Sequence, residues 1–336
     1  MAAAGREQKS TRNGLLADGP ATTPSDRQPF YSSRLSFILV DREMPQKRAY
    51  KVVDAFSSQP TKGNPVAVVL DGEGLTDAQM QAIAGWTNLS ETTFVLPAMD
   101  ATADYRLRIF TPQVELPFAG HPTIGTAHAM LEAGRVTPKE GVLVQECAKG
   151  LVRISIEEGP EPRDRQIRFA LPVATTQSIT SSGVNELLDV IPQIDSTTPP
   201  LIIDVGPRWL VATVSDVNDL IGMDPDYPRI AALCDKVGGI GITLFADDPK
   251  QGPAAIEVRT FTPADGIDED PVCGSGNGCV AVYRRAHGMI KDESAYVASQ
   301  GRKVGRDGKL LVELDSEGNI TVGGAGVTTV DGYIHV

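Results

Sequence analysis

The chain carries one stretch twice. The first copy is Arg108-Ile109-Phe110-Thr111-Pro112, and Gly120-His121-Pro122 follows it. The second copy is Arg259-Thr260-Phe261-Thr262-Pro263, and Gly274-Ser275-Gly276 follows it. In both copies an apolar segment runs into a Thr-Pro turn, and a loop then ends at a glycine that opens a segment with helical character. Two copies are too few for a solenoid, so this self-similarity predicts two related domains.

The loops of the two copies share further features. Glu115 precedes the glycine of the first copy, and Glu269 and Asp270 precede the glycine of the second. Both helical segments stop alike, at Gly134 and at Gly288. We therefore expect each domain to aim a helix N-terminus at the cleft between the two domains.

Length and composition narrow the class of protein. With 336 residues, 41% hydrophobic and 22% charged, the chain has the length of two domains and the composition of an ordinary globular protein. Its net charge of −12 argues against nucleic-acid binding, which needs a basic patch. No apolar run approaches the roughly 18 residues of a membrane helix, so we expect no membrane partner.

The cysteines and histidines give no sign of a metal site. The four cysteines form no Cys-x-x-Cys pair, and the four histidines are scattered without ligand spacing. The glycine-rich stretches lack the Lys-Ser/Thr ending of a phosphate loop and the helix that a nucleotide site needs. We predict a cytoplasmic protein with reduced thiols, no metal and no cofactor.

The N-terminal residues 1–45 differ from the rest. They are rich in Ser, Thr, Arg, Pro and Gly, and they lack hydrophobic periodicity until residues 35–40. This composition predicts a disordered extension, and Met44 is an alternative start just ahead of the folded part.

Beyond the extension, the pattern predicts many short strands and few helices, which favours α+β domains with strongly bent sheets. Thr76 and Gln79 fit a capping box and predict that a helix begins there. The polar residues 157–165 are the expected domain linker. Further helices are expected near residues 185–190 and 228–236. The expected strands cover residues 50–56, 66–70, 94–96, 105–109, 142–144, 151–154, 167–169, 209–214, 241–245, 256–261, 309–314 and 319–322.

Several motifs, in order along residues 49–334, resemble the PhzF-like isomerases of phenazine biosynthesis. They are Gly63-Asn64-Pro65, Asn88-Leu89-Ser90-Glu91-Thr92, Phe110-Thr111-Pro112 with residues 115–122, and Glu269-Asp270-Pro271 with Gly274-Ser275. The resemblance implies the diaminopimelate epimerase fold, with two pseudo-symmetric domains, each a curled, mostly antiparallel sheet around a central helix. It places the N-terminal domain at residues 46–162 with a returning strand at 326–336, and the C-terminal domain at residues 163–325.

The resemblance also implies roles for three side chains. Glu91 matches the general acid/base that moves a proton between substrate carbons, and a closed, partly apolar pocket would bring its pKa toward the working pH. His121 matches a catalytic or substrate-orienting residue, which histidine suits at neutral pH. Asp270 matches the acidic residue that holds or polarises the substrate.

Backbone groups are the expected anion site. Free N–H groups at the two helix starts, at Gly120 and at Gly274 with Ser275, can bind a substrate carboxylate, because helix dipoles favour an anion. Glycine lets the backbone approach the ligand closely.

Cys273 and Ala119 bear on the subfamily. Cofactor-free racemases of this fold present one cysteine before each Gly pair, whereas here the second position is Cys273 and the first is Ala119. A two-thiol racemase is therefore not expected. Cys273 stays open as a second base, because a helix N-terminus would lower a thiol's pKa, or as an inert buried cysteine.

The leading hypothesis is a cofactor-independent isomerase of a small, carboxylate-bearing substrate, in a setting such as secondary metabolism. Two alternatives stay open. One is an epimerase or dehydratase that uses Cys273, and the other is a PhzF-like fold that binds a small molecule without catalysis. The resemblance also suggests a homodimer.

Overall fold

The structure is a computed structural model, and it describes residues 46–251 and 255–336. These residues belong to one compact unit. The predicted disordered extension 1–45, with Met44, lies outside them. Among the described residues, no helix is long and apolar enough to cross a membrane.

The first half is built on a sheet of nine strands, to which the end of the chain contributes one. Hydrogen-bonded neighbours follow the order β18-β1-β2-β3-β4-β6-β7-β8, with the short β5 beside β4. The bounds are β1 Lys47–Ala55, β2 Asn64–Val69, β3 Glu91–Leu96, β4 Tyr105–Phe110, β5 Glu115–Leu116, β6 Val142–Cys147, β7 Gly150–Glu157, β8 Gln166–Ala170 and β18 Gly326–His335.

The second half repeats this sheet. Its neighbours follow the order β9-β10-β11-β12-β13-β15-β16-β17, with the short β14 beside β13. The bounds are β9 Thr175–Ser178, β10 Leu201–Asp204, β11 Arg208–Thr213, β12 Gly241–Asp247, β13 Ile256–Thr262, β14 Ile267–Asp270, β15 Ser294–Gln300, β16 Gly308–Leu314 and β17 Ile320–Gly324. An antiparallel pairing of β17 with β8 joins the two sheets.

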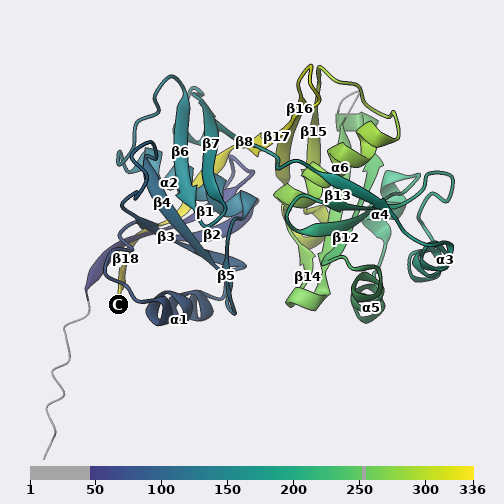
Figure 1. Cartoon of the computed structure of the whole chain (residues 1–336), viewed down its shortest axis with the longest axis horizontal. Coiled ribbons are helices and arrows are strands. Elements are labelled where there is room, and N and C mark those ends of the chain that lie inside the picture. Colours follow the sequence, from purple (N-terminus) through teal and green to yellow (C-terminus); the bar gives the residue numbers. More distant parts are fainter. Residues whose placement is uncertain (1–45, 252–254) are drawn as a thin grey trace, which may run out of the picture. The chain divides into compact units, whose positions relative to one another are not determined.

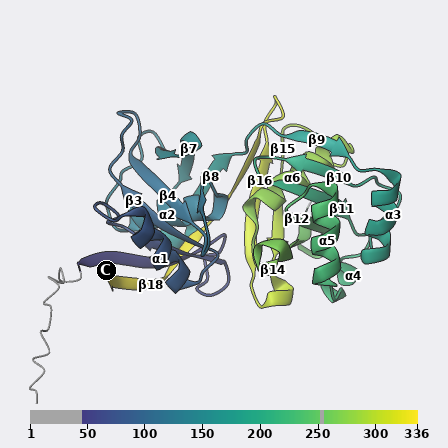
Figure 2. The ribbon, with the colours of Figure 1, turned by 60° about the horizontal axis from the view of Figure 1, so that its bottom comes forward.

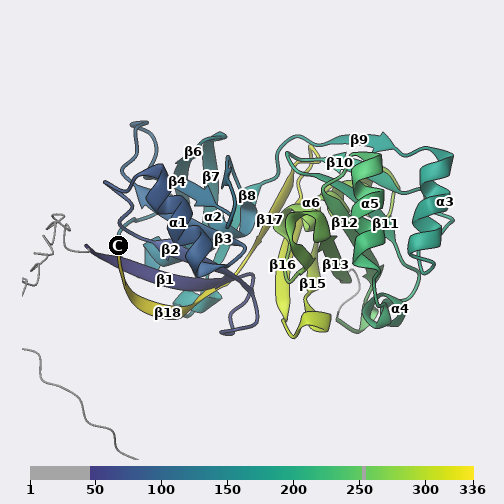
Figure 3. The same ribbon diagram turned by 90° about the horizontal axis from the view of Figure 1, so that it is seen from below.

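The two halves also agree in strand direction. Parallel pairs join β2 to β3 and β4 to β6 in the first half, and β11 to β12 and β13 to β15 in the second. The other described pairings are antiparallel. The last strand, β18, runs antiparallel to β1 over its whole length, from Lys47 opposite His335 to Ala55 opposite Gly326. Figures 1 to 3 show these two strands, from opposite ends of the described chain, side by side.

Helices occupy equivalent places in the two halves. Along the chain, the connection between the strands of the first parallel pair contains α1 in one half and α4 and α5 in the other. The connection of the second pair contains α2 in the first half and α6 in the second (Figure 1). In addition, α3 follows β9 and packs beside α5 (Figure 3). The bounds are α1 Asp77–Thr87, α2 Gly120–Glu132, α3 Ser181–Val190, α4 Val217–Gly222, α5 Tyr227–Val237 and α6 Gly274–Ala286, with 3-10 turns at Pro162–Asp164, Pro249–Gln251, Pro263–Asp265 and Arg302–Val304.

The helices α2 and α6 are the centre of each half. In α2 every residue from His121 to Met130 is buried, which is typical of a helix that a sheet surrounds. Small residues make this enclosure fit. A Cβ on Gly125 of α2 would lie 2.3 Å from Val66 of β2, and one on Gly278 of α6 would lie 2.5 Å from Leu171. Each half is thus a curled, mostly antiparallel sheet around a central helix, and the predicted fold class is confirmed.

Local predictions had mixed outcomes. The capping box at Thr76 and Gln79 is present, and α1 begins at Asp77 as expected. The helix α3 begins at Ser181, four residues before the predicted 185, because Thr180 caps it. The sequence does not predict the strands β5, β9, β10, β14 and β15 or the helix α4. The polar linker predicted at 157–165 includes the end of β7 and a 3-10 turn.

Candidate active site

Glu91 is the first residue of β3. The preceding helix α1 ends at Thr87, and the left-handed backbone of its C-cap Asn88 (φ 52°) turns the chain sharply toward the strand. In β3, Glu91 lies opposite Val66 of the parallel strand β2. Its side chain is only 14% exposed, so the carboxylate is held away from most of the solvent.

His121 is the second residue of α2, and its side chain is 8% exposed. Its Nε2 lies 3.0 Å from Oε2 of Glu91, so the imidazole and the carboxylate are within ion-pair distance. Within the described part of the chain, neither of these two atoms has a hydrogen-bond partner at an acceptable angle. The two side chains are therefore coupled mainly by charge across a short, buried contact.

Asp270 ends β14 in the second half, and yet its carboxylate reaches the first half. Its Oδ1 accepts hydrogen bonds from the backbone N–H of Val272 and from Nδ2 of Asn64, each at 3.0 Å. The same Asn64 Nδ2 donates to the carbonyl of Val272 at 3.0 Å and lies 3.4 Å from His121 Nδ1. Asn64 thus bridges Asp270 and His121.

The charges of this group act on each other. Burial alone raises the pKa of Glu91, but the positive charge and contact of His121, with the Ser90 hydroxyl, outweigh burial and bring the pKa below its ordinary 4.5. Burial lowers the pKa of His121, whereas Glu91 and then Asp270 raise it, and the balance lies above 6.5. Burial raises the pKa of Asp270. The expectation that burial brings the pKa of Glu91 up toward the working pH is wrong, because His121 is so close.

The glycines at the two helix starts are explained by aromatic packing. A Cβ on Gly120 would lie 2.8 Å from the ring of Phe169, and one on Gly274 would lie 3.2 Å from the ring of Phe56. Phe56 is itself strained, because a bulky residue at φ 63° is a genuine outlier. These contacts disfavour a larger residue at Gly120 and leave little room for one at Gly274, whether or not a ligand approaches the backbone.

The polar side chains at the start of α6, Ser275 and Cys273, already have hydrogen-bond partners in the protein. Ser275 Oγ accepts a hydrogen bond from Nε1 of Trp209 at 3.0 Å. Cys273 is the N-cap of α6, and its Sγ accepts a hydrogen bond from the N–H of Gly276 at 3.3 Å. At the start of α2, by contrast, Ala119 offers no side-chain cap. The free N–H groups at α2 are the better candidate for an anion site.

The pKa of the Cys273 thiol bears on the two alternatives for this residue, a second base or an inert buried cysteine. Burial, and then the nearby Asp270 carboxylate, raise the pKa of Cys273 well above its ordinary range, although Ser275 and the Gly276 N–H act in the opposite direction. Of the two alternatives left open for Cys273, this favours the inert buried cysteine over the second base, because the residue is 5% exposed and next to a carboxylate.

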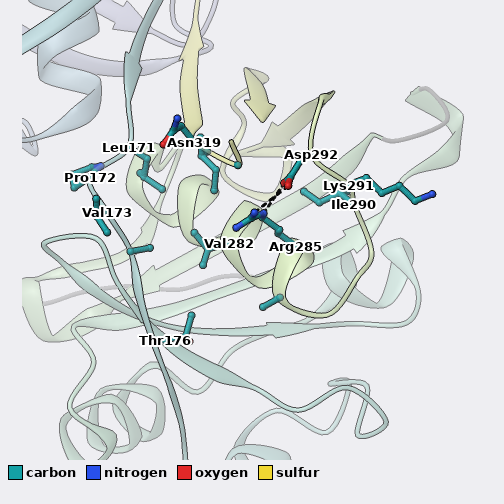
Figure 4. Close-up of a pocket in the computed structure, with 14 residues that line it drawn as sticks. Leu171, Pro172, Val173, Thr176, Val282, Arg285, Ile290, Lys291, Asp292 and Asn319 are labelled. Carbon is teal, nitrogen blue, oxygen red and sulfur yellow. Dashed lines mark hydrogen bonds and ion pairs between the residues drawn. The ribbon is translucent and has the colours of Figure 1, made fainter. Parts of the chain in front are cut away.

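No group of three or more His, Cys, Asp or Glu side chains that could hold a metal occurs among residues 46–251 and 255–336. A cavity of about 730 Å³ lies elsewhere, in the second half, and Figure 4 shows it. Its lining includes Leu171, Val173 and the ion pair of Arg285 Nε with Asp292 at 2.7 Å. None of the predicted site residues lines it, so its size does not make it the active site.

The structure brings Glu91, His121, Asp270 and Cys273 into one buried neighbourhood, with Gly274 and Ser275 at the adjoining helix start. Asn64 was missed as a site residue, although its motif Gly63-Asn64-Pro65 had been noted. Gln300 was missed as well. Its side chain donates to the Asp270 carbonyl at 2.9 Å and accepts from the Cys273 N–H at 3.1 Å.

Known proteins resemble this chain over most of its length. The Antisense-enhancing sequence 1 protein of Schizosaccharomyces pombe is 39% identical over 294 residues, which cover 85% of this chain and 98% of that protein. The trans-2,3-dihydro-3-hydroxyanthranilate isomerase of Pseudomonas fluorescens is 34% identical over 293 residues, which cover 85% and 98% of the two chains.

A solved structure shows the same fold. The phenazine biosynthesis protein of the PhzF family from Bacillus anthracis superposes with a TM-score of 0.76 at 26% identity, over 87% of this chain and 100% of that chain. The family model of phenazine biosynthesis-like proteins, PhzC-PhzF, matches residues 53–332. The chain therefore belongs to the phenazine biosynthesis-like (PhzF) family and is an isomerase.

Proposed function

We propose that this isomerase moves a proton between two carbons of a small, carboxylate-bearing substrate, with Glu91 as the general acid/base. The observation that carries the proposal is the buried contact of Glu91 Oε2 with His121 Nε2 at 3.0 Å. Because His121 lowers the pKa of Glu91, the carboxyl is ionised at neutral pH and ready to accept a proton.

The reaction needs no group from outside the protein and the substrate. A C–H bond of the substrate breaks as an O–H bond forms on Glu91, and the electron pair is delocalised toward an activating group of the substrate. The O–H bond of Glu91 then breaks as a C–H bond forms at the second carbon. Glu91 is a carboxylate again at the end, so one base on one face is sufficient and no cofactor is required.

His121 and Asp270 are the proposed orienting groups, and the uncapped start of α2 at Gly120 is the proposed site for the substrate carboxylate. Burial supports this assignment. With the Glu91 and His121 side chains 14% and 8% exposed, charges that develop in the reaction are weakly screened, which strengthens electrostatic stabilisation.

The substrate that we propose to test first is trans-2,3-dihydro-3-hydroxyanthranilate, because a relative with 34% identity is named as its isomerase. Other cyclic amino and hydroxy acids belong in the same panel. We further propose a homodimer in the cytoplasm, a location that suits four cysteines that are all free thiols.

The alternatives have less support. A one-thiol epimerase or dehydratase needs the Cys273 thiolate, but burial raises the pKa of this thiol and its sulfur already caps α6. A non-catalytic binder has no need of an ionised glutamate beside a histidine in a buried site.

The test is a proton-NMR screen of the full chain in deuterated water with this panel. We expect turnover of at least one acid, and loss of that turnover in Glu91→Gln with a nearly unchanged melting temperature. A folded Glu91→Gln protein that retains turnover would reject Glu91 as the acid/base. Binding of a panel acid without conversion or deuterium exchange would instead favour the non-catalytic binder.

A further inference from the structure

Asn64 occupies a position that bears on the protonation state of His121. It is the first residue of β2 and is 1% exposed. Its side-chain nitrogen faces three acceptor positions: Asp270 Oδ1 at 3.0 Å, the Val272 carbonyl at 3.0 Å, and His121 Nδ1 at 3.4 Å. Asn64 is thus the side chain whose amide nitrogen lies against His121 Nδ1.

The orientation of the Asn64 amide follows from its partners. A carboxylate and a backbone carbonyl are acceptors only, so the group that faces them must be the NH₂ and not the amide oxygen. Asn64 Oδ1 points away and has no hydrogen-bond partner among the described residues. Turning the amide over would bring Oδ1 against two oxygens, which would cost two hydrogen bonds and add repulsion. The NH₂ is therefore fixed toward His121.

This donor face selects the tautomer of His121. An N–H on Nδ1 would point at the NH₂ of Asn64, whereas a lone pair on Nδ1 can share one of its two hydrogens, which also bond Asp270 Oδ1 and the Val272 carbonyl. Whenever the ring is neutral it therefore carries its proton on Nε2, the atom 3.0 Å from Glu91 Oε2, which is protonated in the charged ring as well. An Nε2 that already carries a proton has no lone pair with which to accept another.

We propose that Asn64 is a positioning residue that holds His121 as the Nε2–H tautomer, so that the proton taken by Glu91 returns to the same substrate molecule. The inference rests on the proposed function of Glu91. After the C–H bond breaks, the new O–H of Glu91 faces an N–H and not a base. The proton cannot pass to His121 and from there to water, so its outlet is the second carbon of the substrate.

The tautomer can be measured without any substrate. In protein labelled with ¹⁵N-histidine, long-range correlations from the ring protons distinguish protonated from unprotonated ring nitrogens, and His121→Asn assigns the signals among the four histidines. We expect Nε2–H in the wild type and a swap to Nδ1–H in Asn64→Asp, whose carboxylate accepts where the amide donated. Asn64→Leu, which has neither group, should give a mixture of the two tautomers.

Asn277 provides a matched control. It is also a fully buried asparagine, and its Nδ2 donates to the Cys273 carbonyl at 2.9 Å and to Gln300 Oε1 at 2.7 Å. Asn277→Leu removes similar hydrogen bonds without touching His121, so we expect it to keep the Nε2–H tautomer. Nδ1–H in the wild type, or an unchanged tautomer in a folded Asn64→Asp protein, would overturn the proposal. Thermal melting identifies which variants are folded.

The consequence for catalysis is a change in isotope content. In deuterated water, with the same dihydro-hydroxyanthranilate probe or another acid that the screen finds, the wild type should form product with little solvent deuterium at the receiving carbon. Asn64→Leu should raise this incorporation toward one deuterium per product molecule. Unchanged incorporation beside a changed tautomer would refute the role in proton retention. If Glu91→Gln retained turnover, the function of Glu91 would fail, and the tautomer measurement would still decide the effect of Asn64.

Discussion

The two halves of the molecule share a strand order but supply different side chains to the candidate active site. Each half has a bidentate Arg–Glu pair between neighbouring strands, Arg108 of β4 with Glu115 of β5 in the first and Arg259 of β13 with Glu269 of β14 in the second. In both halves the guanidinium also lies over a phenylalanine ring two residues on, at 5.1 Å and 4.9 Å. The duplicated stretch therefore has a structural role, because it supplies the same ion pair and ring contact in both halves. The candidate site residues are not repeated in this way.

The catalytic candidates are divided unequally between the halves. The first half supplies Glu91 and His121 and leaves the start of α2 without a side-chain cap. The second half supplies Asp270, and the thiol of Cys273 caps α6. The two halves thus share a scaffold, and under the proposed function the first supplies the acid/base while the second supplies supporting groups. The predictions below test this division, beginning with the largest expected effect.

The largest difference in kcat is expected between a variant of the Glu91 carboxyl in the first half and a variant of the Cys273 thiol in the second. Glu91→Gln should lower kcat by about 10²–10⁴, the usual contribution of a general acid/base. Cys273→Ser should leave kcat close to wild type, because a serine hydroxyl can still cap α6. Steady-state kinetics on the acid that the screen identifies measures both.

A chemical measurement checks the same division. Since burial and Asp270 raise the pKa of Cys273, iodoacetamide should react with it slowly at neutral pH and cause little inactivation. Rapid inactivation that substrate prevents, together with a Cys273→Ser variant as inactive as Glu91→Gln, would make the two halves equal partners in catalysis.

The two Arg–Glu pairs should differ in how much they contribute to the free energy of unfolding. The side chains of Arg259 and Glu269 are 2% and 3% exposed, whereas those of Arg108 and Glu115 are 16% and 37% exposed. Arg259→Met leaves a buried carboxylate unpaired and should cost about 3–5 kcal/mol of unfolding free energy. Arg108→Met should cost about 1 kcal/mol or less. Urea unfolding of both variants measures the difference.

The double variant Arg259→Met/Glu269→Leu is the control for this second prediction. It leaves no unpaired charge, so it should recover much of the stability that Arg259→Met loses. Equal losses at Arg108 and Arg259 would show that burial does not set the strength of these pairs.

The repeat made much of the fold predictable, because its turns and helix starts are local features of the sequence. The site was less predictable, since its contacts join distant residues. Asn64 and Asp270 are 206 residues apart, and nothing local to Gly63-Asn64-Pro65 indicates their hydrogen bond. The direction of the Glu91 pKa likewise depends on its distance to His121, which the sequence does not contain. The helix start at Thr180 was missed for a different reason, because the apolar residues that marked α3 lie only in its later part.

Two buried carboxyls should give the halves opposite pH dependence. Burial, opposed by Arg302, raises the pKa of Glu257 in the second half from 4.5 to about 7, whereas His121 lowers that of Glu91 in the first. For Glu257 the folded state binds the proton more tightly, so its stabilisation is complete below pH 4.5 and is lost as the pH rises through 7. For Glu91 the sign is reversed, and stability is lost as the pH falls below 4.5.

Glu257→Gln should therefore stabilise the protein relative to wild type at pH 8 and not at pH 5. The expected difference is about 1–3 kcal/mol, at about 1.4 kcal/mol per pKa unit. Urea unfolding at the two pH values measures it. A stabilisation of equal size at both pH values would show that Glu257 does not titrate between them.

The smallest predicted effect concerns the caps of the two central helices. Ala119→Ser would give α2 the side-chain cap that α6 already has. Because Pro122 lacks an N–H, the new hydroxyl can accept only from the first turn's remaining donors, notably the N–H of His121. The gain in stability should be at the low end for an N-cap, about 0.5 kcal/mol.

The N–H of His121 is also a proposed contact of the substrate carboxylate, so KM should rise about tenfold, as the loss of one charge-assisted hydrogen bond implies, while kcat changes little. Thermal melting and steady-state kinetics separate the two effects, and Cys273→Ser, which exchanges one cap for another at α6, is the matched control. A more stable Ala119→Ser protein with an unchanged KM would place the substrate carboxylate away from α2.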